Sequence, residues 1–206
     1  MTEKTATSDQ QQLILHIGAH KTGTSAIQVY LRRNQAKLQA RGWQILLPPK
    51  PQGRPANWNF LFRIDPGPVF RLHSSALQTM QAQIDKNSRN VILSAEDLFF
   101  LEPPEIHEFA KSIASRFDRI HLVAYLRRQD RMAISHWQQA AQTAQSAALF
   151  GNPTGPLLEL SDAAAAYLDY SARLEAWIAA CTPQKVSCRV YDRARLADGD
   201  AVTDFL

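Results

Sequence analysis

The chain has 206 residues, of which 45% are hydrophobic, a composition that suits one compact domain and is tight for two. Its net charge of +4 suits an anionic ligand, but we expect no nucleic-acid partner, because nucleic-acid binding needs a dense basic face. No stretch approaches the roughly 20 apolar residues that span a bilayer, so we expect no integral membrane segment. The polar N-terminal residues lack the apolar segment of a signal peptide, so we expect a cytoplasmic protein.

Short apolar runs alternate with helical patterns along the chain. The first half predicts a polar, disordered tail over 1–12, a strand over 13–17, a helix over 24–40, a strand over 43–47, a long loop over 48–68 with a short helix near 57–62, and a helix over 70–86. The second half predicts a strand over 91–94, a helix over 103–115, a strand over 120–126, helices over 130–149 and 162–180, a strand over 186–191 and a helix that begins near 200.

This alternation predicts a single α/β domain over 13–206, with a central, mostly parallel sheet and helices on both of its faces. The chain stops at Leu206, inside the last expected helix, so we expect the C-terminal part of the domain to be incomplete. Cys181 and Cys188 lack the spacing of metal ligands, and we expect both to be reduced thiols.

A small-residue loop separates the first expected strand from the helix that follows it. Its residues are Gly18-Ala19-His20-Lys21-Thr22-Gly23-Thr24-Ser25. Such a loop aims backbone N–H groups and a helix N-terminus at one point, which is an arrangement that binds phosphate or sulfate. Gly18 and Gly23 have the separation of the Walker pattern GxxxxGK[ST], but Thr24 stands in the place of the Walker lysine. The lysine is Lys21, inside the loop, so a nucleoside triphosphatase with this loop would be unusual.

The loop resembles the one that sulfotransferases place around the 5′-phosphosulfate of 3′-phosphoadenosine 5′-phosphosulfate (PAPS), which has the pattern Lys-Thr-Gly-Thr-Ser/Thr. A second motif of that family is an Arg at a strand end with a Ser eight residues later, and together these residues bind the 3′-phosphate. Arg127 and Ser135 have this separation, while Gln129 stands where the family usually has Pro. An arginine at a strand end can hold a phosphate with two parallel hydrogen bonds.

The chain therefore resembles PAPS-dependent sulfotransferases, most closely the bacterial carbohydrate and cell-surface type. The resemblance implies a P-loop-like three-layer fold, PAPS as cosubstrate, 3′-phosphoadenosine 5′-phosphate (PAP) as product, and no metal. The residues that it implies for nucleotide binding are Gly18, Lys21, Thr22, Gly23, Thr24, Ser25, Arg127 and Ser135. A third, weaker similarity, over 189–196, implies a segment that borders the adenine.

Lys21 is expected to neutralise the charge that grows on the bridging oxygen of the leaving group. Glu96, just after the strand over 91–94, is the expected base for the acceptor proton, and His20 is the alternative base. His16 and His136 are expected to be structural.

The sequence leaves alternatives open. Glu96 and Asp97 also suit a site for Mg²⁺ in a P-loop kinase or nucleotide hydrolase, or Asp97 caps a helix that begins at Leu98. A non-catalytic nucleotide-binding relative is the third reading. The expected acceptor is a small molecule or a glycan, with a carbohydrate favoured, and the aromatic residues of 48–75 either bind it or form core. The sequence does not indicate the oligomeric state.

Overall fold

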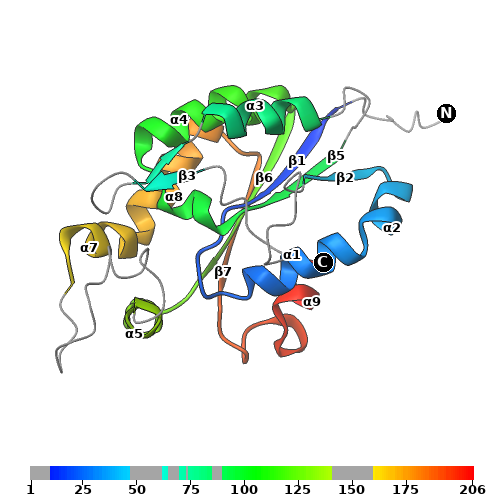
Figure 1. The fold of residues 1–206 in the computed structure, drawn as a ribbon. Helices are drawn as coiled ribbons and strands as arrows, with labels where there is room; N and C mark the ends of the chain where they lie inside the picture. Colours follow the sequence, from blue (N-terminus) through cyan, green and yellow to red (C-terminus); the bar gives the residue numbers. More distant parts are fainter. Residues whose placement is uncertain (1–9, 47–61, 65–69, 73, 85–89, 141–159) are drawn as a thin grey trace, which may run out of the picture.

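The computed structural model describes residues 10–46, 62–64, 70–72, 74–84, 90–140 and 160–206. Its central sheet has five parallel strands in the order β2-β5-β1-β6-β7, and β3 and β4 form a separate antiparallel pair (Figure 1). The strands are β1 (Gln12–His16), β2 (Trp43–Ile45), β3 (Phe62–Ile64), β4 (Phe70–Leu72), β5 (Asn90–Ser94), β6 (Arg119–Leu126) and β7 (Lys185–Val190). The predicted α/β class is confirmed.

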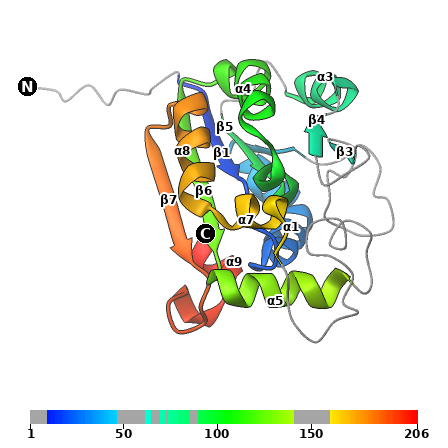
Figure 2. The same ribbon diagram turned by 90° about the vertical axis from the view of Figure 1, so that its left-hand side faces the viewer.

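Helices cover both faces of the central sheet. The α-helices are α1 (Thr24–Arg33), α2 (Gln35–Ala40), α3 (Ser74–Gln83), α4 (Pro103–Ser112), α5 (Gln129–Ala140), α7 (Asp162–Leu168), α8 (Tyr170–Cys181) and α9 (Ala201–Phe205). The 3₁₀-helices are η2 (Glu96–Phe100), η3 (Ala114–Arg116) and η4 (Ala197–Gly199). Figures 1 and 2 show α1 and α9 on one face, and α4 and α8 on the other. None of the helices in these described ranges is long and apolar enough to cross a membrane.

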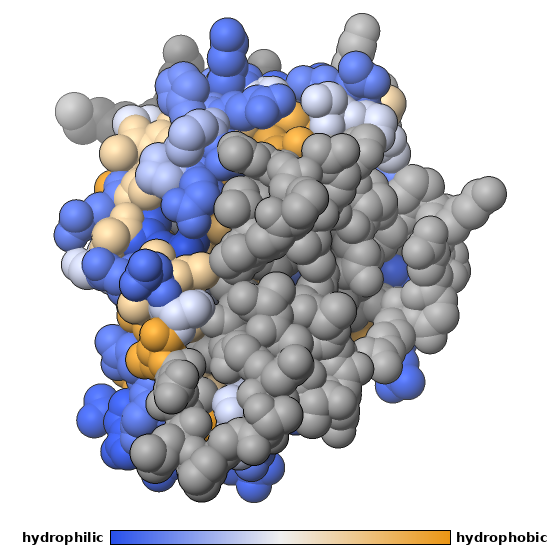
Figure 3. Space-filling model, turned by 60° about the vertical axis from the view of Figure 1, so that its left-hand side comes forward, coloured by the Kyte–Doolittle hydropathy of each residue, from blue (hydrophilic) through white to orange (hydrophobic). Residues whose placement is uncertain are grey.

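Alternation along the strands divides the core into two layers, because successive side chains of a strand point to opposite faces of the sheet. The larger layer includes Leu13, Leu15, Val91, Leu93, Leu122 and Ala124 from the strands. The smaller layer includes Ile92, Val123 and Tyr125 from the strands, Ile27 and Leu31 from α1, and Ala201 from α9. On the surface seen in Figure 3, the described side chains are mainly hydrophilic, with scattered apolar patches. The three-layer arrangement therefore follows from the period of two in the strand sequences.

Two helices that we predicted as continuous are each broken by a polar residue. Asn34 separates α1 from α2, and its side-chain amide donates to the backbone oxygen of Tyr30 at 3.0 Å. Asp169 separates α7 from α8, and its carboxylate accepts from the backbone N–H of Ala172 at 3.1 Å. Short polar side chains compete with the helical ladder for backbone partners, so the Asn34 side chain bonds back to α1 at the break while the Asp169 side chain caps the start of α8.

The helix predicted over 70–86 begins at Ser74, because the preceding residues form β4. Phe62 pairs with Leu72 and Ile64 with Phe70. In the sequence of each strand the apolar residues stand two positions apart, which is the period of a strand. The helix predicted near 57–62 is wrong at Phe62, where β3 begins. The rest of that short helix, and residues 141–149 of the helix predicted over 130–149, lie outside the described residues.

His16 ends β1 in a fully buried position between the sheet and α9. Its Nδ1 is hydrogen-bonded to the Ser94 hydroxyl at 2.7 Å, and its ring centroid lies 5.7 Å from that of Tyr125 and 5.5 Å from that of Phe205. Burial lowers the pKa of His16 to about 3, because the charged imidazolium would lose its hydration there. The folded protein therefore holds this imidazole neutral, which agrees with the structural role that we expected.

We expect the free energy of unfolding to fall as the pH is lowered from 6.5 to about 5, because the unfolded chain then protonates His16 and the folded chain does not. Each proton taken up on unfolding contributes about 1.4 kcal/mol per pH unit. Denaturant titrations at a series of pH values give the slope of the free energy of unfolding against pH. In His16→Asn this slope should be smaller by about 1 kcal/mol per pH unit than in the unaltered chain. The control is His107→Asn, an exposed histidine on α4. An unchanged slope in His16→Asn would contradict the buried, neutral state of the ring.

Candidate functional site

Three segments that we singled out in the sequence meet at one edge of the sheet. Strand β1 pairs in parallel with β5 on one side and with β6 on the other. The loop that follows β1, the Glu96-Asp97 pair that follows β5 and Arg127 after β6 therefore leave the sheet at its carboxyl edge. The chain runs from β1 to one side of the sheet and later returns to the other side, and open α/β sheets bind ligands at such a switch point.

The phosphate loop, residues 18–25, leaves the sheet by a tight turn. The Ala19 N–H donates to the Tyr125 oxygen at 2.8 Å, so β1 and β6 stay paired beyond the end of β1. Lys21 and Gly23 then take left-handed conformations, with φ of 60° and 80°. Between them, Thr22 is fully buried and its hydroxyl donates to the Ala19 oxygen at 2.6 Å, which closes the turn.

Backbone N–H groups at the start of α1 are available to an anion. The N–H groups of residues 21–25 have no hydrogen-bond partner within the described ranges, whereas those of Ala26 and Ile27 donate to the Gly23 oxygen at 3.0 and 3.2 Å. Successive N–H groups around left-handed residues form a concave, positively polarised surface that suits phosphate or sulfate. Lys21 is exposed on this loop and adds a positive charge.

Glu96 lies against the phosphate loop from the side of β5. The Thr24 hydroxyl donates to its carboxylate oxygen Oε2. The loop backbone approaches it closely as well, since a Cβ on Gly18 would lie 3.1 Å from the Glu96 Cα. Sequence reasoning proposed Thr24 and Glu96 as separate site residues, and the structure joins them.

The sequence left open that Asp97 caps a helix beginning at Leu98. It does not, because η2 already begins at Glu96. Its carboxylate Oδ1 lies 3.0 Å from Nε2 of His20. The other ring nitrogen of His20, Nδ1, lies 3.3 Å from the hydroxyl of Tyr167 on α7. His20 therefore links the phosphate loop to η2 and to α7 at once.

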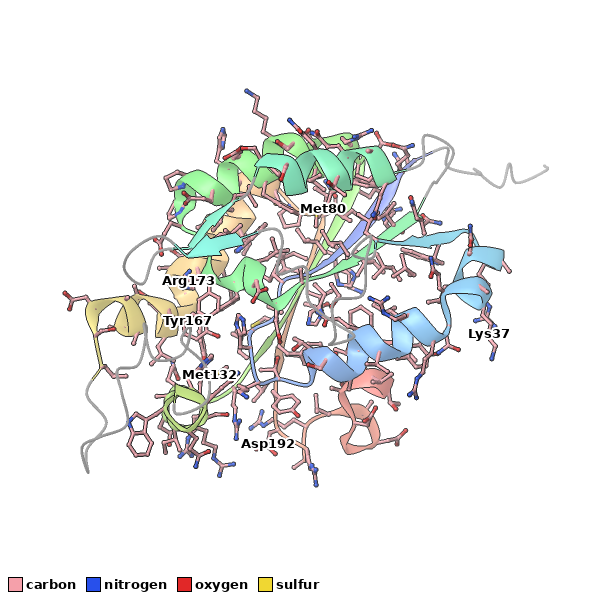
Figure 4. The ribbon with its side chains drawn as sticks, in the orientation of Figure 1. Lys37, Met80, Met132, Tyr167, Arg173 and Asp192 are labelled. Atoms are coloured by element: carbon pink, nitrogen blue, oxygen red, sulfur yellow. The ribbon has the colours of Figure 1, made fainter. Side chains whose placement is uncertain are left out.

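Tyr167 and Arg173 were not found by sequence reasoning, because nothing local connects them to the loop. The Arg173 guanidinium is buried and lies 5.7 Å from the centre of the Tyr167 ring (Figure 4). It donates to the backbone oxygens of Phe99 at 2.9 Å, Leu101 at 3.2 Å and Ala166 at 3.0 Å. These bonds tie η2, which carries Asp97, to α7 and α8.

Arg127 is the first residue after β6 and is half-buried, and Ser135 lies on α5. Burial raises the pKa of Tyr170, and the positive charge of Arg127 opposes this rise. The next residue on α5, His136, lies with its ring centroid 5.7 Å from that of His20. Within the described part of the chain, no hydrogen bond joins Arg127 or Ser135 to the phosphate loop.

The segment that we expected to border the adenine lies against the phosphate loop at Tyr191. A Cβ on Gly23 would lie 3.2 Å from the Tyr191 ring atom Cε2 and 2.8 Å from the Cβ of Ala201. Position 23 therefore needs glycine for two reasons, a left-handed φ and the lack of space for a side chain.

Among the described residues, no group of three or more His, Cys, Asp and Glu side chains lies together so that it could hold a metal ion. Cys181 is buried and Cys188 is exposed, and neither forms a disulfide in the structure.

No family model matches the chain. It is 31% identical over 116 residues to an uncharacterized protein of Archaeoglobus fulgidus, a match that covers 56% of this chain and 29% of that protein. The chain thus spans less than a third of this relative's length. The crystal structure of a sulfotransferase from Alicyclobacillus acidocaldarius is similar with a TM-score of 0.48 and 13% identity, over 86% of this chain and 72% of that one. These similarities assign no activity to the chain.

The packing around Gly23 predicts that Gly23→Ala destabilises the fold more than the same change at Gly42. Both glycines have a positive φ, which costs an alanine about 1 kcal/mol. A Cβ at Gly42 meets nothing closer than 4.0 Å, whereas one at Gly23 must displace Ala201 or Tyr191, which adds about 1–3 kcal/mol. Chemical denaturation of the two variants measures the difference. Equal losses of stability would show that α9 does not pack on the loop.

Proposed function

We propose that this chain is a sulfotransferase that moves a sulfuryl group from PAPS to an acceptor hydroxyl or amine, with a carbohydrate or related metabolite as the acceptor. The observation that carries the proposal is the phosphate loop itself. The N–H groups of residues 21–25 have no partner among the described residues and lie at the switch point of the sheet. The cation of the loop is Lys21, and Thr24 replaces the Walker lysine and donates to Glu96.

The roles of the residues follow from the needs of sulfuryl transfer, which resembles phosphoryl transfer in depending on alignment and charge stabilisation. The N–H groups of residues 21–25 bind the 5′-phosphate of PAPS. Lys21 neutralises the charge that develops on the bridging oxygen as the bond between sulfur and that oxygen breaks. Arg127 and Ser135 bind the 3′-phosphate.

Glu96 is the proposed base. The acceptor oxygen or nitrogen attacks the sulfur, its proton passes to the Glu96 carboxylate, and PAP leaves with the electron pair of the broken bond. The Thr24 hydroxyl holds Oε2 of this carboxylate, while Oε1 has no hydrogen-bond partner in the described part of the chain. One carboxylate oxygen is thus fixed and the other is available for the acceptor proton. His20, the alternative base, has a partner at each ring nitrogen.

We expect isothermal titration to show binding of PAP without metal and no binding of ATP with Mg²⁺. Lys21→Ala should abolish sulfuryl transfer while the fold persists, because it removes the charge that stabilises the leaving group. The matched control is Lys37→Ala, an exposed lysine on α2 that lies far from Tyr167 in Figure 4. Binding of ATP with Mg²⁺ but not of PAP would instead favour a P-loop kinase with Glu96 and Asp97 as metal ligands.

Glu96→Gln should lower kcat by about 10²- to 10⁴-fold, because general base catalysis contributes a factor of this size, and should leave PAP binding nearly unchanged. Transfer from ³⁵S-labelled PAPS to a panel of saccharides, phenols and amines measures the rate. Glu108→Gln, an exposed glutamate on α4, is the control. PAP binding with no transfer by the unaltered chain to any acceptor would support a non-catalytic relative.

A further inference from the structure

Lys21 holds a conformation that its own backbone disfavours. Its φ of 60° lies in the left-handed region, where a residue with a Cβ is strained and persists only if its surroundings hold it. Lys21 itself is exposed, so the restraint must come from its neighbours in the chain. On one side, the buried Thr22 closes the turn onto the Ala19 oxygen. On the other side stands His20.

His20 is restrained at every polar atom of its ring. Nε2 contacts the Asp97 carboxylate at 3.0 Å, and Nδ1 contacts the Tyr167 hydroxyl at 3.3 Å. A carboxylate accepts and a hydroxyl can donate, so between the two tautomers of the uncharged ring these partners favour the one with the proton on Nε2. The ring also packs on Phe100, at 4.2 Å between centroids. With both nitrogens engaged, His20 has no free lone pair with which to accept a proton from an acceptor.

Tyr167 reaches the backbone of the loop as well as this ring. The His20 backbone N–H donates to the Tyr167 hydroxyl, so one oxygen contacts both the main chain and the side chain of His20. The tyrosine is itself fixed, being fully buried with its ring centroid 4.8 Å from that of Phe100 and 5.3 Å from that of His136. Arg173 lies over its ring, as Figure 4 shows.

We propose that Tyr167 and Asp97 are positioning residues, which act through His20 to hold Lys21 and the N–H groups of the phosphate loop in their anion-binding arrangement. The effect that we expect on PAP binding rests on the proposed function. It assigns His20 to the support of the loop, and leaves proton transfer to Glu96.

The first test is the PAP affinity of Tyr167→Phe, which removes one oxygen and keeps the ring. We expect the dissociation constant to rise about fivefold, the equivalent of one lost hydrogen bond. Tyr30→Phe on α1 makes the same change at a hydroxyl without a hydrogen-bond partner in the described ranges, and should leave the affinity unchanged. Asp97→Asn keeps an acceptor for Nε2–H and should retain more affinity than Asp97→Ala. An affinity of Tyr167→Phe equal to that of the unaltered chain would overturn the proposal.

The second test needs no nucleotide, so it separates this proposal from the proposed function. Nitrogen NMR of His20 should show a protonated Nε2 and an unprotonated Nδ1, and the three-bond amide coupling of Lys21 should report its left-handed φ. In Tyr167→Phe, the Nδ1 signal should shift and the Lys21 coupling should move towards an average over several conformations. A proton on Nδ1 in the unaltered chain, or an unchanged Lys21 coupling in Tyr167→Phe, would overturn the proposal even if PAP does not bind.

Discussion

The parallel pairing of β1 with β5 and β6 is the constraint on which the rest of the structure depends. It places His16 opposite Ser94 on one side and opposite Val123 on the other, so three chain segments leave the sheet at the same edge. A shift of one residue in either register would turn the alternating side chains of a strand to the wrong face, and both hydrophobic layers oppose such a shift. The core therefore sets where the phosphate loop meets Glu96.

The phosphate loop is shaped by its neighbours more than by its own sequence. Gly18 and Gly23 permit close approach, and the space beside them is filled by Glu96 from η2, by Tyr191 after β7 and by Ala201 from α9. The polar contacts of the loop also reach a distant segment, since Thr24 bonds to Glu96 and His20 to Asp97. A loop held from several directions loses little conformational entropy when an anion binds, which is the general basis of preorganised sites.

Sequence reasoning predicted what depends on local pattern. The order of the five strands of the central sheet, the loop between β1 and α1 and the carboxylates after β5 were visible as periodicities and spacings, whereas β3 and β4 were missed. The breaks at Asn34 and Asp169 were missed because helical periodicity continues across them. The Thr24–Glu96 and His20–Asp97 contacts join residues 72 and 77 positions apart, so they depend on strand register and could not be predicted from spacing. Tyr167, 147 positions from His20, carried no signal at all.

The packing of Ala201 and Tyr191 on Gly23 has a consequence for protein synthesis. The loop is translated well before the groups near residue 200 that cover Gly23. Strand β1 receives its partner β6 only once the residues from 119 onward have been made. While the chain grows on the ribosome, the loop must remain without its native cover, because domains complete their packing only when distant segments have emerged. A loop that is made early is thus among the last parts of this domain to reach its final shape.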